Sequence, residues 1–401
     1  MTQEIGKFSR PLWAEVNLDY LRDNVRAIRR YLKPETKILG VIKANAYGHG
    51  MVEVGSVLAR EGVETLGVAS LEEALTLKKK RIKSEILILG YSHEDFSGEI
   101  VANDVSQTIG HEFQLDALAK AARKLKKRAK IQIKIDTGMT RMGCLPDEAP
   151  ELITNALGNK SIEVKGIYTH FARADEINGI YTKKQFHQFM RIIEPFKKVL
   201  KGVDIHCSNS AGVLNFPEFQ QDMVRIGIAL LGNNPAFQVA NPLPLKPIFS
   251  LKTRVVELKI VPPTTGVGYS HRYQTSGDIK IGVIPIGYAD GYSTLLSNRG
   301  EVLIKGNRYP IVGQVSMDFA TFECPVNSNI QIHDEVTLLG KDNGGEITLY
   351  EMAEWMRYPI YEALCSMGPR INRRYIDSTK NGTEQPEARK PKTISRGRYT
   401  K

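Results

Sequence analysis

The amino-acid sequence predicts a (β/α)8 barrel followed by a second, mostly β domain. Two observations carry this prediction. Eight short apolar runs alternate with helical patterns between residues 38 and 232, and beyond about residue 241 strand-like runs are separated by turn residues instead. Strand–helix alternation is typical of a parallel sheet covered by helices, and eight such units in roughly 200 residues match a barrel. A doubly wound open sheet is the alternative, but no GxGxxG motif follows the first strand.

The eight expected barrel strands each end in polar or glycine residues. They are ILGVIK (38–43), TLGVAS (65–70), EILILG (85–90), SQTIG (106–110), IQIKID (131–136), VKGIYTH (164–170), DIHCSN (204–209) and MVRIGIALLG (223–232). Amphipathic helical patterns lie between most of them, for example over residues 113–128 and 183–202.

A proline-rich hinge, NPLPLKP (241–247), separates the two expected domains. Beyond it, residues 249–261, 279–287, 300–313 and 334–340 have strand character with turn residues between them. We therefore expect the barrel over residues 13–241 and the mostly β domain over residues 242–375 together with residues 1–12. The opening run LWAEVN (12–17) is strand-like and could belong to either domain. Residues 376–401 lack apolar periodicity and predict a basic, disordered tail.

Composition favours a cytoplasmic protein. The chain of 401 residues has no apolar run near the roughly 20 residues of a membrane span, and no apolar leader at its start. Its four cysteines have neither metal-binding nor disulfide-framework spacing, so we expect no metal. The net charge of +11 comes partly from the tail, where seven Lys/Arg stand against three Asp/Glu. The rest is spread over solvated helix faces, so we expect neither a nucleic-acid nor a membrane partner.

Polar side chains recur where the expected barrel strands end, which is where barrels carry their functional residues. These residues are Lys43, Lys134, Asp136, Arg141, His170, Asn209, Ser210 and Arg225. Each has an ordinary explanation, because a strand-end lysine usually extends to solvent and a lone histidine is usually a satisfied core residue. Their convergence on one rim favours a functional site.

Lys43 suits covalent chemistry with an aldehyde. A lysine in an apolar, water-poor place loses its proton readily and becomes a nucleophile. The aldehyde that most needs such a lysine is pyridoxal 5′-phosphate, whose ring is an electron sink. The segments NSAG (209–212) and RIGIALLG (225–232) supply hydroxyl and backbone N–H groups for its phosphate after the seventh and eighth strands.

Seven segments, spread in order between about Trp13 and Arg370, resemble the signature segments of bacterial alanine racemases. They are VIKANAYGHG (41–50), KIDTGMTRMG (134–143), GIYTHFARADE (166–176), HCSNSAG (206–212), MVRIGIALLG (223–232), IPIGYADGY (284–292) and VGQVSMDF (312–319). The resemblance implies an isomerase that interconverts L-alanine and D-alanine with pyridoxal phosphate and supplies D-alanine for peptidoglycan.

The resemblance also implies roles for individual residues. Lys43 and Tyr269 are the two acid/base groups, one on each face of the substrate, as racemisation requires. His170, Arg225 and His206 support Tyr269, and Lys134 is expected as a carbamate that holds Arg141. The expected cofactor contacts are Lys43, Tyr47, Arg141, Asn209, Ser210, Arg225, Gly227, Ile228 and Tyr361. The expected substrate contacts are Arg141, Met317 and Tyr269.

Because Tyr269 lies in the second domain and Lys43 in the barrel, the resemblance implies a homodimer with shared active sites. Two alternatives stay open. One is a broader-specificity amino-acid racemase of the same fold, since Thr294 stands where some family members place an arginine. The other is a non-enzymatic pyridoxal phosphate carrier. Such carriers resemble the barrel alone, so the β domain that holds Tyr269 argues against this reading.

Overall fold

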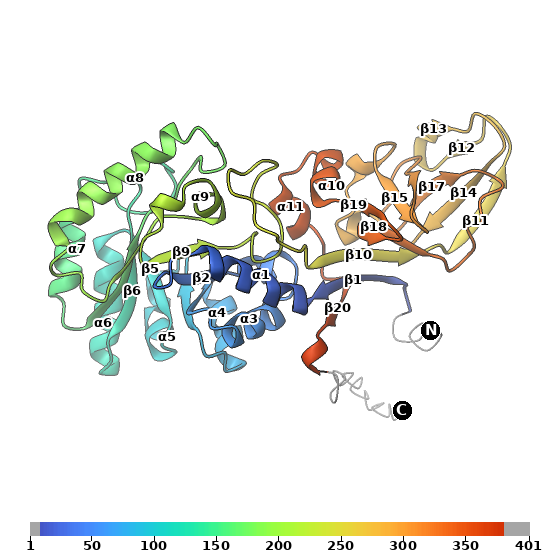
Figure 1. Ribbon diagram of the computed structural model, residues 1–401. Coiled ribbons are helices and arrows are strands. Elements are labelled where there is room, and N and C mark those ends of the chain that lie inside the picture. Colours follow the sequence, from blue (N-terminus) through green and yellow to red (C-terminus); the bar gives the residue numbers. More distant parts are fainter. Residues whose placement is uncertain (1–8, 381–401) are drawn as a thin grey trace, which may run out of the picture.

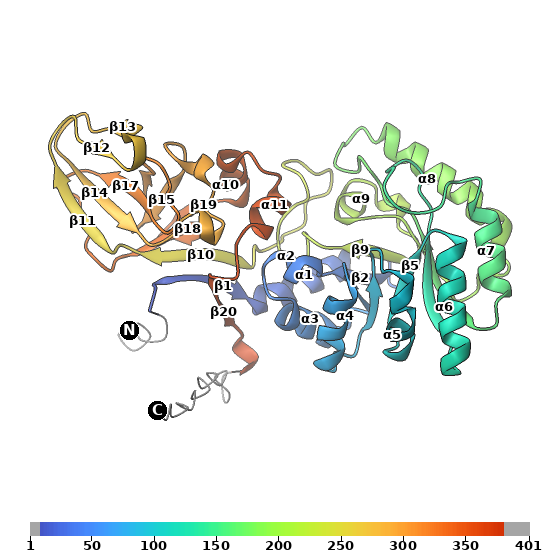
Figure 2. The ribbon, with the colours of Figure 1, turned by 180° about the vertical axis from the view of Figure 1, so that it is seen from behind.

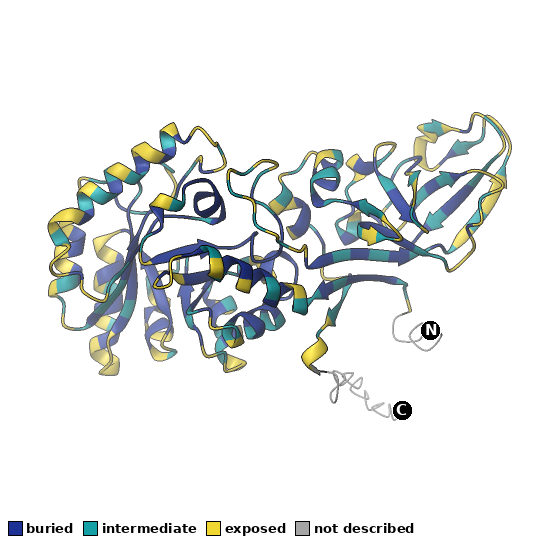
Figure 3. Ribbon diagram, viewed as in Figure 1, coloured by how far each residue is buried: buried dark blue, intermediate teal, exposed yellow. Residues whose placement is uncertain are grey.

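Two lobes, one rich in helices and one rich in strands, lie side by side in the computed structural model, which describes residues 9–380 (Figures 1 and 2). The helical lobe contains an eight-stranded parallel sheet, and its strands are buried along most of their length (Figure 3). The outward faces of the surrounding helices carry most of that lobe's exposed residues. Within residues 9–380, no helix combines the length and the apolar character needed to cross a membrane.

The eight-stranded sheet confirms the predicted barrel. Its strands are β2 (Lys37–Val41), β3 (Thr65–Val68), β4 (Glu85–Ile88), β5 (Ser106–Ile109), β6 (Ala129–Lys134), β7 (Ile162–Tyr168), β8 (Asp204–His206) and β9 (Met223–Ile226). They pair in the order β8-β7-β6-β5-β4-β3-β2-β9, so the first strand of the barrel lies beside the last. At the seam between β8 and β9, the backbone amide of Arg225 donates to the carbonyl of Ser208 at 2.9 Å.

The helices of this lobe alternate with its strands, as predicted. They are α1 (Leu18–Tyr31), α2 (Lys43–Tyr47), α3 (Met51–Arg60), α4 (Leu71–Lys79), α5 (Ser97–Ala102), α6 (Glu112–Leu125), α7 (Ala149–Gly158), α8 (Ile180–Ile193) and α9 (Ser210–Asn215). Helix α1 precedes β2, and the short segment α2 has left-handed backbone angles in its interior. Helix α6 shows why they cover the sheet. Its buried Leu115, Leu118, Ala119 and Ala122 recur at three- and four-residue spacing and form one apolar stripe.

The second lobe is mostly β, as predicted. Its strands are β1 (Leu12–Asn17), β10 (Phe249–Arg254), β11 (Glu257–Val261), β12 (Gly266–Val267), β13 (Tyr273–Gln274), β14 (Ile279–Ile284), β15 (Glu301–Ile304), β16 (Asn307–Pro310), β17 (Ala320–Cys324), β18 (Glu335–Asp342), β19 (Gly345–Ile347) and β20 (Asn372–Ile376). Two helices, α10 (Leu349–Met356) and α11 (Ile360–Cys365), complete it. Helix α11 lies on the side nearest the barrel (Figure 1).

Strand β1 requires a correction to the expected start of the barrel at residue 13. This strand pairs antiparallel with β10 and parallel with β20, so it belongs to the main sheet of the second lobe. Its side chains Leu12, Ala14 and Val16 are buried on one face of the strand, and Trp13 on the other face is buried as well. The barrel elements therefore begin only after Asn17.

The sequence prediction also places the start of the tail, at residue 376, too early. Ile376 ends strand β20, and residues 378–380 form a short 3-10 turn. Between them, Asp377 accepts a hydrogen bond from the guanidinium of Arg22 in helix α1 at 2.7 Å. A distant ion pair of this kind leaves no local periodicity to detect. The rest of the predicted tail, residues 381–401, and residues 1–8 lie outside the described residues.

Candidate active site

A cavity of about 580 Å³ lies at the carboxyl ends of the barrel strands, and helix α11 of the second lobe forms part of its wall. It brings together most of the residues that the sequence predicted: Lys43, Tyr47, Lys134, Arg141, His170, Asn209, Ser210, Arg225, Gly227, Ile228 and Tyr361. Its volume falls within the usual range of small-molecule sites.

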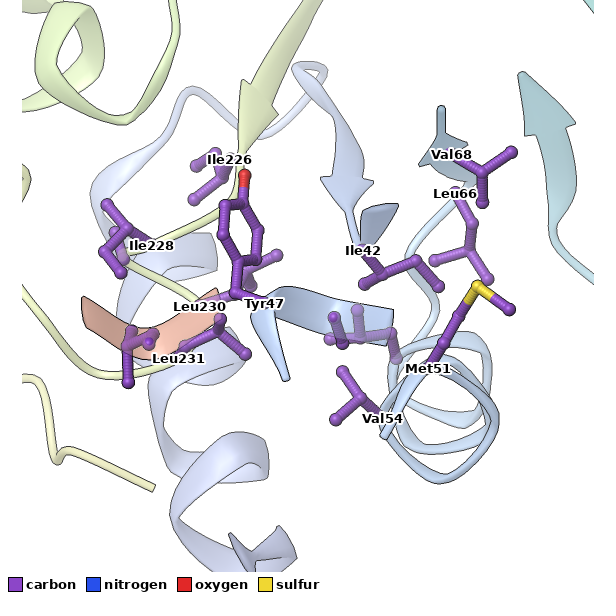
Figure 4. Packing of buried hydrophobic residues seen from close by; sticks show 14 of the residues in the cluster. Ile42, Tyr47, Met51, Val54, Leu66, Val68, Ile226, Ile228, Leu230 and Leu231 are labelled. Carbon is purple, nitrogen blue, oxygen red and sulfur yellow. The ribbon is translucent and has the colours of Figure 1, made fainter. Parts of the chain in front are cut away.

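Lys43 is followed by an unusual left-handed turn. Ala44, Asn45, Ala46 and Tyr47 all have φ between 52° and 54°. Each non-glycine residue in this conformation costs about 1–2 kcal/mol, so the surrounding structure must hold the turn in place. Packing helps on both sides: Ile42 and Met51 lie near Leu66 and Val68, while Tyr47 extends between the turn and Ile226 and Ile228 (Figure 4).

Tyr47 and Tyr361 present hydroxyl groups at one end of the cavity. Their ring centroids are 6.1 Å apart. Burial raises the pKa of Tyr47, and it raises the pKa of Tyr361 to about 12, so both hydroxyls stay protonated and can donate. Gly227 makes room for Tyr47, because a Cβ added at Gly227 would lie 2.5 Å from the Tyr47 hydroxyl. The amide of Gly227 donates to Ser210 Oγ at 3.1 Å.

The two lysines of the cavity are easier to deprotonate than ordinary lysines. Burial lowers the pKa of Lys43, and the charge of Arg141 lowers it further. Burial, Arg141 and Arg225 together lower the pKa of Lys134 to about 8. Lys43 therefore meets the first requirement of a nucleophilic amine, and the carbamate expected on Lys134 stays a prediction.

Arg141 lies at the exposed mouth of the cavity on a loop that Asp136 organises. The Asp136 carboxylate accepts hydrogen bonds from the amides of Gly138, Met139, Thr140 and Arg141 at 2.8–3.0 Å. Although burial opposes ionisation, these four bonds lower the pKa of Asp136. The loop conformation, and with it the position of Arg141, therefore depends on an ionised Asp136.

Arg225, in strand β9, is the centre of a buried hydrogen-bond network. Its guanidinium bonds Nδ1 of His206 at 3.0 Å and Nδ1 of His170 at 3.1 Å. It also donates to the carbonyls of Thr169 and Cys207 at 2.7 and 2.9 Å. Because a guanidinium only donates, both Nδ1 atoms must accept, which places the ring protons on Nε2.

Both histidines of this network are neutral. Burial and the charge of Arg225 hold the pKa of His170 and that of His206 well below their usual range. His206 lies behind the cavity and bonds the amide oxygen of Gln132 at 2.9 Å. His170 lines the cavity with its Nε2–H left to donate.

Two residues predicted for the site, Tyr269 and Met317, are absent from the described lining of this cavity. Both lie in the second lobe, where Tyr269 is 70% exposed and Met317 is 53% exposed. Tyr269 begins a 3-10 turn between β12 and β13, and the Met317 carbonyl accepts from the amide of Ala289 at 3.1 Å. One chain thus assembles the barrel residues but not this pair.

Tyr168 is a cavity residue that the sequence reasoning missed. Its ring stacks on His206 with centroids 4.8 Å apart, and the guanidinium of Arg225 lies 4.9 Å from the ring centroid. Its hydroxyl bonds Thr108 at 3.0 Å. A signal was present, because Tyr168 stands two residues before His170 and side chains at that spacing in a strand share a face. Helix α11 also adds Glu362 and Cys365, which no motif indicated.

Comparison with known proteins identifies the family. Residues 16–235 match the model of the alanine racemase N-terminal domain, and residues 248–375 match that of the C-terminal domain. The alanine racemase of Desulfovibrio desulfuricans is 38% identical over 373 residues, which are 92% of this chain and 99% of the relative.

Two solved structures agree with this match. The alanine racemase of Clostridium difficile 630 has a TM-score of 0.88 at 36% identity and covers 93% of this chain and 97% of its own. The alanine racemase of Bartonella henselae with covalently bound pyridoxal phosphate has a TM-score of 0.81 at 28% identity and covers 91% of this chain and 99% of its own. The resemblance seen in the sequence is confirmed, and the chain belongs to the alanine racemase family.

Proposed function

We propose that this protein interconverts L-alanine and D-alanine with pyridoxal 5′-phosphate held in the barrel cavity, and that it supplies D-alanine for peptidoglycan. Membership of the alanine racemase family supports the reaction. The observation that carries the assignment to this cavity is Lys43, a lysine of lowered pKa that lies two residues after strand β2, in the same cavity as a cluster of hydroxyl donors.

The residues of the cavity fit a phosphorylated, anionic cofactor. Among the described lining residues, Lys43, Lys134, Arg141 and Arg225 are basic side chains, whereas Glu362 alone is acidic. The protonated hydroxyls of Tyr47 and Tyr361 suit a phosphate, and the missing side chain of Gly227 leaves room beside them. Asn209, Ser210, Gly227 and Ile228 would hold the phosphate with them.

When bound, the cofactor supplies the electron sink that makes the Cα–H of alanine acidic. Lys43 would hold the cofactor covalently and would serve as one acid/base group. A proton removed from one face of Cα must return on the other, so a second group is needed on the opposite face. We assign that role to the hydroxyl of Tyr269, with Arg141 and Met317 on the substrate carboxylate.

Arg225 sets the electronic character of the site. It would face the ring nitrogen of a bound cofactor, where a guanidinium that never loses its proton would disfavour a proton on that nitrogen. A weaker electron sink limits side reactions such as decarboxylation. Arg225 also fixes His170, whose Nε2–H is then free to donate to the oxygen of Tyr269 and stabilise its deprotonated form.

The protein acts as a homodimer in this proposal, because Tyr269 must come from a second copy. Tyr269 is largely exposed and is absent from the described lining of its own cavity. The second lobe also exposes Tyr288, Met317 and Phe319, and the fold brings their segments together: the amide of Tyr288 donates to the carbonyl of Ser316 at 3.0 Å. Exposed apolar side chains grouped in this way are typical of a protein–protein contact.

Three experiments test the chemistry. Borohydride reduction of the purified protein, followed by peptide mapping, should place the cofactor on Lys43; a label on another lysine would contradict the assignment. The variant Tyr269→Phe should retain the cofactor and lose racemisation, and unchanged turnover would exclude a two-base role. Solvent-deuterium exchange at Cα over a panel of L- and D-amino acids separates an alanine racemase from a broader racemase and from a carrier.

Mixing two inactive variants tests the shared sites. A dimer of one Lys43→Ala chain and one Tyr269→Phe chain retains one intact site if Tyr269 comes from the partner. Activity should therefore return when the two inactive proteins are unfolded and refolded together. No recovery, with mixed dimers demonstrated by mass spectrometry, would show that each chain builds its own site.

A further inference from the structure

Glu73, in helix α4, binds the backbone next to Lys43. The amide of Ala44 donates to Glu73 Oε1 at 2.8 Å, and the amide of Ala69 donates to Glu73 Oε2 at 2.7 Å. Ala44 follows Lys43, and Ala69 follows strand β3, which is the parallel neighbour of β2. One carboxylate therefore joins the ends of two adjacent barrel strands at the cavity, since Ala44 and Ala69 both line it.

These bonds hold one end of the left-handed turn, and other groups hold the remaining end. The side chain of Asn45 accepts from the amide of Met51 at 2.9 Å, and Arg373 Nε donates to the carbonyl of Gly48 at 3.0 Å. Neither of these bonds involves the amide that follows Lys43. A backbone conformation this costly persists only when its surroundings fix it, and at the end that carries Lys43 the side chain that does so is Glu73.

Glu73 also acts on Lys43 through its charge. Burial, followed by the charge of Arg141, lowers the pKa of Lys43, and the negative charge of Glu73 partly opposes both effects. The same side chain thus influences both where the Lys43 backbone lies and how readily its amine loses a proton.

We propose that Glu73 is a positioning residue of the active site, which fixes the backbone from which Lys43 projects and supplies a negative charge beside it. The inference rests on the proposed role of Lys43 as the cofactor-binding lysine. Glu73 acts through Lys43 and through the two amides. Its carboxylate accepts both bonds at once, which an amide side chain cannot do with its NH2 group.

The test compares Glu73→Gln with Glu72→Gln. Glu72 is the adjacent glutamate in the first turn of helix α4 and is exposed, so its variant controls for the lost charge and for helix effects. Hydrogen exchange of the cofactor-loaded full chain reports on the amides of Ala44 and Ala69. Removing a hydrogen bond to a charged acceptor should speed their exchange about tenfold in Glu73→Gln and leave it unchanged in Glu72→Gln.

A second measurement reports on the protonation of the Lys43 amine. The full chain is freed of cofactor with hydroxylamine, and acetylation of Lys43 by limiting acetic anhydride is mapped over a pH series. The acetylation profile of Glu73→Gln should move to lower pH, because the variant lacks the negative charge that partly offsets the lowering of the Lys43 pKa by burial. The profile of Glu72→Gln should match that of the wild type. Glu73→Asp keeps the charge but is one methylene too short to reach both amides. In Glu73→Asp the amides of Ala44 and Ala69 should exchange faster, while the acetylation profile of Lys43 should be nearly unchanged. This variant replaces Glu73→Gln in the test if Glu73→Gln does not fold.

Exchange in the Glu73 variants equal to that in Glu72→Gln would overturn the proposal, and so would an acetylation profile of Glu73→Gln that does not move. Neither readout depends on turnover. Reductive labelling identifies the cofactor-binding lysine independently, so failure of this inference and failure of the proposed function give different results.

Discussion

His49 gives the structure a defined sensitivity to acid. Its ring is fully buried behind the Lys43 turn, edge-on to Phe249 of strand β10, with ring centroids 5.0 Å apart. Nδ1 lies 3.0 Å from the carbonyl of Tyr47 and must donate to it, while Nε2 has no hydrogen-bond partner in the described part of the chain. Burial, with a smaller contribution from the charge of Arg373, lowers the pKa of His49 to about 4.

The depressed pKa fixes the direction of the pH dependence. A histidine in the unfolded chain binds its proton near pH 6.5. Above that pH, His49 therefore has almost no effect on the free energy of unfolding, and the folded state loses stability as the pH falls from 6.5 towards 4. With these two values, protonation of the unfolded chain removes about 2 kcal/mol of unfolding free energy between pH 7 and pH 5. His170 and His206 add losses of the same sign, because their pKa values are also lowered.

The variant His49→Gln isolates this contribution. Glutamine can still donate to the Tyr47 carbonyl but does not titrate. Between pH 7 and pH 5 the variant should lose about 2 kcal/mol less than the wild type, whatever its stability at pH 7, because His170 and His206 are present in both. Denaturant unfolding of the full chain at constant cofactor concentration measures the difference. His187→Gln, at an exposed position on helix α8, is the matched control. Equal losses in the wild type and in His49→Gln would refute the reasoning.

Three further predictions concern single side chains. Asp136→Asn removes the charge that binds four amides of the Arg141 loop, so KM for alanine should rise about tenfold in steady-state kinetics; an unchanged KM would contradict the dependence of Arg141 on Asp136. Gly227→Ala forces the Tyr47 hydroxyl aside, so the Kd for pyridoxal phosphate, measured by titration, should rise about tenfold with the circular dichroism spectrum unchanged. Asp290→Asn weakens the bonds from Arg10 and Arg370, which are partly exposed and also contact Asp318, so denaturation should show a loss of about 1.5 kcal/mol, against none in the exposed control Asp278→Asn.

Much of the barrel and of its rim could be read from the sequence, because the signals are local. Apolar runs ending in Lys43 or His170 mark strand ends, and parallel strands bring their carboxyl ends to one edge. The features that sequence could not supply are mostly non-local. Strand β1 is assigned to its lobe by pairing with residues more than 200 positions away. The bond between Arg22 and Asp377, which also joins distant residues, shows that the tail starts later than predicted.

The left-handed turn after Lys43 illustrates a different limit. Alanine is the strongest helix former, so local propensity over Ala44–Ala46 favours the right-handed conformation. Asn45 is the one residue there that tolerates the left-handed region, and a single asparagine predicts at most one such residue. The conformation depends instead on Glu73, Met51 and Arg373, each of which reaches the turn from another element.

The arrangement of the second lobe explains why one chain is insufficient in our proposal. Helix α11 places Tyr361 in the cavity of its own chain, which fixes that side of the lobe against the barrel. Tyr269 lies between β12 and β13, at the opposite end of the lobe (Figure 1). Bringing Tyr269 to the same cavity would require the lobe to turn end over end, which would withdraw Tyr361. A second copy removes the conflict, because each lobe then serves its own cavity with one end and the partner's cavity with the other.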